Sequence, residues 1–165
     1  MAIHPDFPSS PHEILKPELR WFPADETLRD TSYEKLMPPL VPELRKKVAE
    51  WRTQGYPDIS ATGQTLLRWW FETPHPIPHA DGTIGNFQYY FAQRESVETV
   101  IYLHEYVKVK DKHDLLRFDT RGAVTEKLID ETWRRYVVKM ATGSGKTKTM
   151  SLLLAWSYFH KKYEE

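Results

Sequence analysis

The stretch MATGSGKT at residues 140–147 constrains the fold of this chain more than any other. It follows YVVKM, a short, apolar, β-branched run that is typical of a buried strand. Its last two residues, Lys146 and Thr147, open the segment KTKTMSLLLAWSYFHKKY, which we expect to form a helix ending in basic residues. A strand, a glycine-rich turn and a helix N-terminus are together the parts of a loop that binds phosphate. The sequence therefore predicts an α/β fold built around this turn.

Each residue type in the turn has a chemical reason to be there. Gly143 and Gly145 permit positive φ angles and a close approach of the backbone to phosphate oxygens. Lys146 would reach the β- and γ-phosphates of a bound nucleotide, and the hydroxyl of Thr147 would be the ligand of Mg²⁺. The general pattern GxxxxGK[ST] has a glycine where this chain has Met140, so only the later part of the pattern matches.

Composition limits the other possibilities. With 165 residues, of which 40% are hydrophobic and 13% aromatic, the chain can fill the core of one domain. Lys and Arg number 23, as do Asp and Glu, so net charge gives no reason to expect nucleic acid or an anionic membrane as a partner. The absence of cysteine excludes disulfides, thiolate zinc sites and cysteine nucleophiles. Without a signal peptide or a membrane-length apolar stretch, we expect a soluble, cytoplasmic protein with no membrane partner.

The chain has two compositional halves, because all twelve prolines lie within the first 78 residues. Residues 1–39 suggest an arm that packs through aromatic and apolar side chains, namely Trp21, Phe22, Tyr33, Leu36 and Met37. Hydrophobic periodicity predicts helices at residues 42–54, 64–72, 87–107, around 124–131 and after the glycine-rich turn, with a loop at 74–82.

The segments WRRYVVKMATGSGKT and FAQRESVETVIYL resemble superfamily two helicases and translocases, in the form of the restriction (Res) subunit of type III restriction enzymes and related DEAD/DEAH-box proteins. This resemblance implies that residues 142–147, including Thr142 and Ser144, bind the phosphates of ATP. It also implies that Gln93 recognises adenine, and that Mg²⁺ is the metal. The 53 residues from Gln93 to Lys146 exceed the separation in compact members, so the connector around KVKDKHD looks like an insertion.

The resemblance also implies a domain organisation. Residues 1–60 would be a proline-rich, mainly helical N-terminal extension, and residues 61–165 the start of a P-loop, RecA-like ATP-binding domain that is incomplete after the phosphate-loop helix. The carboxylates and arginines that complete ATP hydrolysis in this family follow the loop. We therefore expect the isolated chain to be catalytically incompetent and, with one strand of a parallel sheet, marginally stable or prone to aggregate.

Two motifs imitate functional sites. Asp130 and Glu131 in LIDET resemble an acidic magnesium motif, but they precede the loop instead of following it, so we interpret them as a solvated helix end. His75 and His79 have a spacing that a metal could use, but the prolines between them favour an extended loop.

The leading interpretation is the ATP-binding N-terminal portion of a DNA-dependent ATPase, helicase or translocase. Its partners would be DNA and, in a type III system, a modification or specificity subunit. The alternative is a non-catalytic nucleotide-binding or protein-interaction module. A compact nucleotide kinase is disfavoured, since its phosphate loop would come near the start of the chain.

Overall fold

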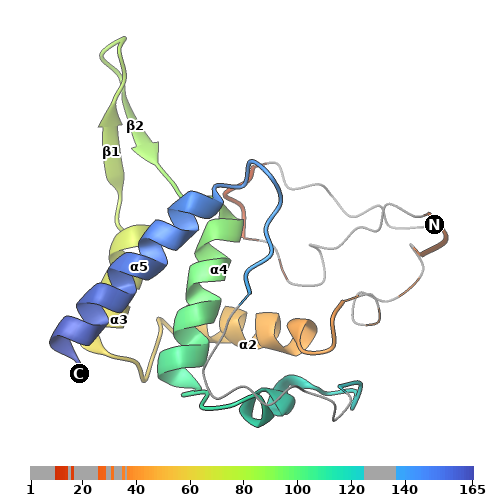
Figure 1. Cartoon of the computed structure of the whole chain (residues 1–165). Coiled ribbons are helices and arrows are strands. Elements are labelled where there is room, and N and C mark those ends of the chain that lie inside the picture. Colours follow the sequence, from red (N-terminus) through yellow and green to blue (C-terminus); the bar gives the residue numbers. More distant parts are fainter. Residues whose placement is uncertain are drawn as a thin grey trace.

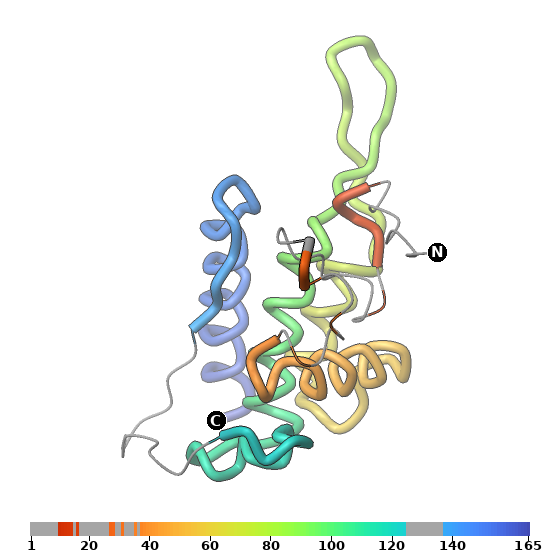
Figure 2. Tube along the Cα trace, turned by 90° about the vertical axis from the view of Figure 1, so that its right-hand side faces the viewer, coloured from red at the N-terminus to blue at the C-terminus, as the bar shows by residue number. Residues whose placement is uncertain are grey.

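The computed structural model describes residues 10–14, 16, 26–28, 31, 35, 37–124 and 137–165. Four α-helices dominate these residues: α2 (Val41–Thr53), α3 (Ala61–Phe71), α4 (Phe91–Ile101) and α5 (Lys146–Tyr163). Figure 1 shows them packed together, with the hairpin of β1 (His75–Pro78) and β2 (Ile84–Phe87) projecting away from them. Helix α4 is central, because it contacts α2, α3 and α5. The quarter turn to Figure 2 shows the same projecting hairpin.

Helix α2 confirms the helix predicted at residues 42–54. Its apolar stripe is buried at Val48 and Trp51. Gly55, with φ of 79°, follows the helix, and its N–H donates to the carbonyl of Arg52 at 2.9 Å. The N–H of Tyr56 then donates to the carbonyl of Trp51 at 3.1 Å, which completes a Schellman motif. The glycine thus ends the helix and turns the chain toward α3.

Helix α3 begins three residues earlier than the predicted start at residue 64. The hydroxyl of Ser60 accepts a hydrogen bond from the N–H of Gly63 at 2.9 Å, which satisfies one of the free donors of the first turn. This cap sets the start of the helix. Leu67 is fully buried, whereas Trp69 is 55% exposed, so the aromatic residues of this helix point in different directions.

The loop predicted at residues 74–82 is wrong for its first half. Residues 75–78 form β1, which pairs antiparallel with β2 so that His75 is opposite Phe87 and Pro78 is opposite Ile84. Pro76 and Pro78 are compatible with this strand because both strands of a two-stranded ribbon are edges, where an N–H can be missing. The expected turn lies at the tip of the hairpin, where the N–H of His79 donates to the carbonyl of Thr83.

The helix predicted at residues 87–107 is partly wrong. Phe87 belongs to β2, and α4 begins only at Phe91. After Ile101 the chain continues as a π-helix, η3 (Tyr102–Tyr106), in which the N–H of Val107 donates to the carbonyl of Tyr102 at 2.8 Å. Short 3₁₀-helices lie at η2 (Glu26–Leu28) and η4 (His113–Phe118). Hydrophobic periodicity located the element but could not detect its change of hydrogen-bond register.

The buried strand predicted at residues 136–140 is also wrong where it can be checked. Residues 137–140 have no strand pairing, and Val137 is 87% exposed. Within the described ranges the hairpin is the one sheet, so a parallel sheet beside the loop is not present there. The α/β fold expected for the chain is therefore observed as mixed helix with a small two-stranded antiparallel sheet.

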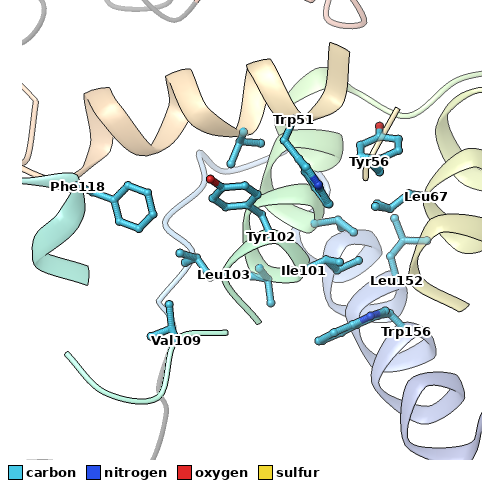
Figure 3. Close-up of a cluster of buried hydrophobic side chains, with 13 residues drawn as sticks. Trp51, Tyr56, Leu67, Ile101, Tyr102, Leu103, Val109, Phe118, Leu152 and Trp156 are labelled. Atoms are coloured by element: carbon cyan, nitrogen blue, oxygen red, sulfur yellow. The ribbon is translucent and has the colours of Figure 1, made fainter. Parts of the chain in front are cut away.

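One hydrophobic core joins the helices. Figure 3 shows Trp51 of α2, Leu67 of α3, Ile101 of α4 and Trp156 of α5 converging in it. The rings of Trp51 and Tyr102 meet edge to face with centroids 5.3 Å apart. The core contains residues from both sides of position 60, and the domain boundary placed there stays a prediction.

Several predictions fall outside the described residues. These are the aromatic arm apart from Met37, the helix at 124–131 beyond its first residue, and Asp130 with Glu131. In the part of the chain that is described, no helix has the length and apolar character needed to cross a membrane.

Candidate nucleotide-binding site

The glycine-rich turn has the backbone geometry that its sequence predicts. Gly143 and Gly145 adopt φ angles of 82° and 78°, in the left-handed region that glycine tolerates best. Helix α5 begins at Lys146, immediately after Gly145. The first N–H groups of a helix have no partner within the helix, and they carry its partial positive charge. The turn therefore leads into a helix N-terminus suited to an anion.

The interior of the turn is held by its own carbonyl groups. The N–H of Ser144 donates to the carbonyl of Ala141 at 3.3 Å, and the Ser144 hydroxyl donates to the same oxygen at 2.7 Å. The Nζ of Lys146 donates to the carbonyls of Met140 at 3.1 Å and Ala141 at 3.0 Å. The ammonium group therefore lies over the turn, where it can exchange these carbonyls for phosphate oxygens.

Thr147 and Thr149 point to different environments. Thr147, the predicted ligand of Mg²⁺, is exposed in the first turn of α5. Thr149 is buried, and its hydroxyl contacts the sulfur of Met140 at 3.6 Å. Met140 therefore occupies a packing position beneath the turn, where the general pattern has glycine.

Gln93 lies against this turn although 51 residues separate it from Ser144. Its side chain is 6% exposed, and its Nε2 donates to the carbonyl of Ser144 at 3.1 Å. Its Oε1 accepts from the N–H of Tyr90 at 3.0 Å, which caps α4. A primary amide has two donor hydrogens and two acceptor lone pairs, so one of each is left over. The structure thus brings Gln93 and the glycine-rich turn together.

Other residues of the first turn of α4 border a cavity of about 270 Å³. Phe91 and Arg94 line it together with aromatic side chains from the end of α3 and from β2. The guanidinium of Arg94 lies 5.4 Å from the ring centroid of Phe71, a cation–π distance. Gln93 is not among the described residues that line this cavity.

Sequence reasoning missed a buried ionic network that anchors α4. Glu98 is fully buried and accepts hydrogen bonds from Arg52 at 2.8 Å, from Arg94 at 2.7 Å and from the hydroxyl of Tyr56 at 2.7 Å. Burial has the largest single effect on the pKa of Arg94 and lowers it, but the charges of Glu98 and Tyr56 and the hydrogen bonds to both together outweigh burial, so the pKa is raised. Burial, followed by the charge of Glu98, raises the pKa of the Tyr56 phenol, so it stays neutral. The i,i+4 spacing of Arg94 and Glu98 was the available signal.

The residues present fit a nucleoside triphosphate with Mg²⁺. The fit rests on two left-handed glycines before a helix of 18 residues, an ammonium group over the turn and an exposed hydroxyl at Thr147. Gly143 contributes open space, since a Cβ there would meet nothing within 4 Å.

Comparison with models of known protein families relates part of the chain to one family. The family model described as "Type III restriction enzyme, res subunit" matches residues 86–165, a range that contains both Gln93 and the turn. This match supports a relation to Res-subunit-like helicases and implies a domain of the P-loop NTPase type. Proteins of that family generally use ATP and Mg²⁺ and act on DNA. Neither the curated proteins nor the solved structures contain a match to the chain.

Proposed function

We propose that this chain is the ATP-binding N-terminal portion of a DNA-dependent ATPase, helicase or translocase like the Res subunit of type III restriction enzymes. The observation that carries the proposal is the hydrogen bond from Gln93 to the carbonyl of Ser144. It joins the two segments on which the resemblance rests, and both lie within the range that matches the family. Residues 61–165 would then be the start of the ATP-binding domain.

In this proposal the turn binds the triphosphate and Gln93 recognises the base. The N–H groups of residues 142–147 and the Lys146 ammonium would neutralise phosphate charge. Thr147 would hold Mg²⁺ through its hydroxyl, and the metal would neutralise charge between the β- and γ-phosphates. Gln93, which keeps one donor and one acceptor, would pair with the edge of adenine. DNA, and a modification or specificity subunit, are the partners expected of the assembled enzyme.

Nucleotide binding tests the proposal more directly than hydrolysis. Phosphoryl transfer also needs an oriented water and positive charge beyond the phosphate loop. We would titrate the purified chain with a fluorescent ATP analogue in the presence of Mg²⁺. Lys146→Ala should weaken binding by about tenfold or more, because a hydrogen bond to a charged group contributes roughly 1.5–3 kcal/mol.

The matched control is Lys148→Ala, which removes another exposed lysine two residues further along α5. This variant should bind the analogue like the unmodified chain. Equal affinities for the unmodified chain and Lys146→Ala would contradict the proposal. Gln93→Ala tests base recognition separately from triphosphate binding. This variant should lose much of its preference for ATP over GTP, while its affinity for the triphosphate should change less.

A second candidate is a protein-interaction module. The observation that favours it is the apolar outer face of α5, where Met150 is 69% and Leu154 is 73% exposed. In this reading the turn would be a relic and the helix face would bind a partner. No measurable nucleotide binding by the folded chain would favour this candidate over the ATPase.

A further inference from the structure

Two histidines and a carboxylate gather at the end of α5 that is distant from the glycine-rich turn. His104 comes from the π-helix η3, His160 lies in the last turn of α5, and Glu165 follows that helix. One ligand atom from each of the three lies within 4.8 Å of the other two. His160 follows Lys146 by 14 residues on the same helix, so it lies roughly 21 Å further along the axis. This cluster is therefore separate from the predicted nucleotide site.

The imidazole rings are held in place by packing. The ring centroid of His104 lies 5.1 Å from that of Trp156 and 5.7 Å from that of His160, in both cases nearly perpendicular. Trp156 is itself buried, and its Nε1 donates to Oε1 of Glu105 at 2.6 Å. His104 belongs to a single turn of π-helix, a departure from α-geometry that often occurs at functional sites. The two rings therefore approach each other on rigid elements.

The two nitrogens of His160 face two different carboxylates. Its Nδ1 lies 3.8 Å from Glu165, and its Nε2 lies 3.9 Å from Glu105. Glu105 is 6% exposed and fixed by donors, since the N–H of Ser60 also reaches its Oε2 at 2.8 Å. A histidine that binds a metal through one nitrogen commonly directs the other to a carboxylate, which orients the ring. Glu105 is placed to serve as that orienting group.

Solvent can reach the cluster of His104, His160 and Glu165. A cavity of about 580 Å³ is lined by His104, Glu105 and His160, with Asp58 and Lys108 among its other walls. Water can therefore reach the cluster and fill coordination positions that the protein leaves open. The exposed carboxylate of Glu165, at 60%, can move by the small distance that closer coordination requires.

We propose that His104, His160 and Glu165 bind a divalent transition-metal ion of the zinc type, with Glu105 as the residue that positions His160. Imidazole nitrogens with one carboxylate suit Zn²⁺ and its neighbours Co²⁺ and Ni²⁺, whereas Mg²⁺ prefers oxygen ligands. The ion would link η3 to the end of α5 and so fix the contact between α4 and α5. The glycine-rich turn lies at the start of α5. By holding α5 in place, the metal ion would therefore also support the turn.

The alternative arrangement at residues 75–79 is less suitable. The Nε2 of His75 lies 2.8 Å from the carbonyl of Trp69, so this ring has a backbone partner. In the described part of the chain, the set of His104, His160 and Glu165 is the group of three that meets the geometric requirement.

The test is a Zn²⁺ titration of the whole chain in competition with a chromophoric chelator. Unmodified protein should bind one Zn²⁺, and either His160→Gln or His104→Gln should weaken binding at least about a hundredfold, since even orienting residues contribute about 10–100-fold. Glu105→Gln should weaken binding by about tenfold. The control is His113→Gln, an exposed histidine at the start of η4, which should bind Zn²⁺ normally.

A spectroscopic measurement on the unmodified chain covers the case in which a variant fails to fold. Added Co²⁺ should give visible absorption bands of nitrogen and oxygen coordination, and it should shift the ring protons of His104 and His160 before those of His75, His79 and His113. Preferential shifts at the hairpin histidines, or binding that His113→Gln lowers as much as His160→Gln, would overturn the proposal. The proposal would also be overturned if the unmodified chain bound no Zn²⁺.

Discussion

Gln93 and Gly145 are so close that a Cβ on the glycine would collide with Nε2 of the glutamine. The contact joins the first turn of α4 to the residue that precedes α5. Gly145 is therefore needed for two reasons, its left-handed backbone and the space above it. Gly143 has nearly the same backbone, with φ of 82° against 78°, but open space where its Cβ would be.

This difference gives a matched pair of substitutions. Gly145→Ala should weaken nucleotide binding more than Gly143→Ala, because both variants strain the backbone but only the first displaces Gln93. Titration with a fluorescent ATP analogue measures the difference. Adding Gln93→Ala to Gly145→Ala should recover part of the lost stability of the chain, since the smaller side chain relieves the collision. Equal effects of the two alanine substitutions would show that the collision has no consequence.

The buried carboxylate of Glu98 should be essential for stability. Glu98→Gln keeps the shape of the side chain but leaves Arg52 and Arg94 without their shared counter-charge, and we expect a loss of about 3 kcal/mol in the free energy of unfolding. Urea denaturation followed by circular dichroism measures it. Glu50→Gln is the control, because Glu50 is 45% exposed and its ion pair with Lys47 should contribute less than about 1 kcal/mol. Similar losses in both variants would contradict this account.

What the sequence predicted depended on how local each feature is. Helix α5 was predicted with its observed bounds because its start is set by the adjacent turn and its length by its own periodicity. The hairpin was missed because Pro76 and Pro78 are signals of a loop, and only the pairing with β2 makes them part of a strand. The run at 137–140 has the composition of a buried strand, but a strand also needs neighbours, and Val137 has none in the described residues.

The candidate site also combines features set by the local sequence with features set by contacts between distant residues. The positive φ angles at Gly143 and Gly145 follow from the local motif. The contact of Gln93 with Ser144 spans 51 residues and was accessible only through a resemblance. The gathering of His104 with His160 depends on how α5 packs against η3, which no spacing in the sequence encodes. The parts of the site that the sequence did not predict are therefore those that depend on packing between residues distant along the chain.

Two neighbouring leucines on α5 should differ greatly in their contribution to stability. Leu152 is 6% exposed and belongs to the core, whereas Leu154 is 73% exposed. Leu152→Ala should lower the free energy of unfolding by about 3 kcal/mol, through lost burial and the cavity that remains. Leu154→Ala should change it by less than about 0.5 kcal/mol. Chemical denaturation of both variants measures the contrast, and equal losses would contradict the burial of only one face of α5.

Ionisation of buried tyrosines should destabilise the chain in alkaline solution. Burial, with smaller effects of Tyr106 and Glu50, raises the pKa of Tyr102 from 10.0 to about 12. Burial raises the pKa of Tyr56 as well. Because the folded state holds these protons more tightly than the unfolded state, the stabilisation is complete below pH 10 and is lost as the pH rises toward 12.

The melting temperature should accordingly fall as the pH rises above about 10, and Tyr102→Phe should make the fall less steep, since phenylalanine has no proton to lose. Thermal melts of the unmodified chain and of this variant between about pH 8 and about pH 11 provide the measurement. Tyr158→Phe, at a position that is 61% exposed, is the control for removing a tyrosine outside the core. If Tyr102→Phe and the unmodified chain gave superimposable pH profiles, burial of the Tyr102 phenol would not be a source of the alkaline instability.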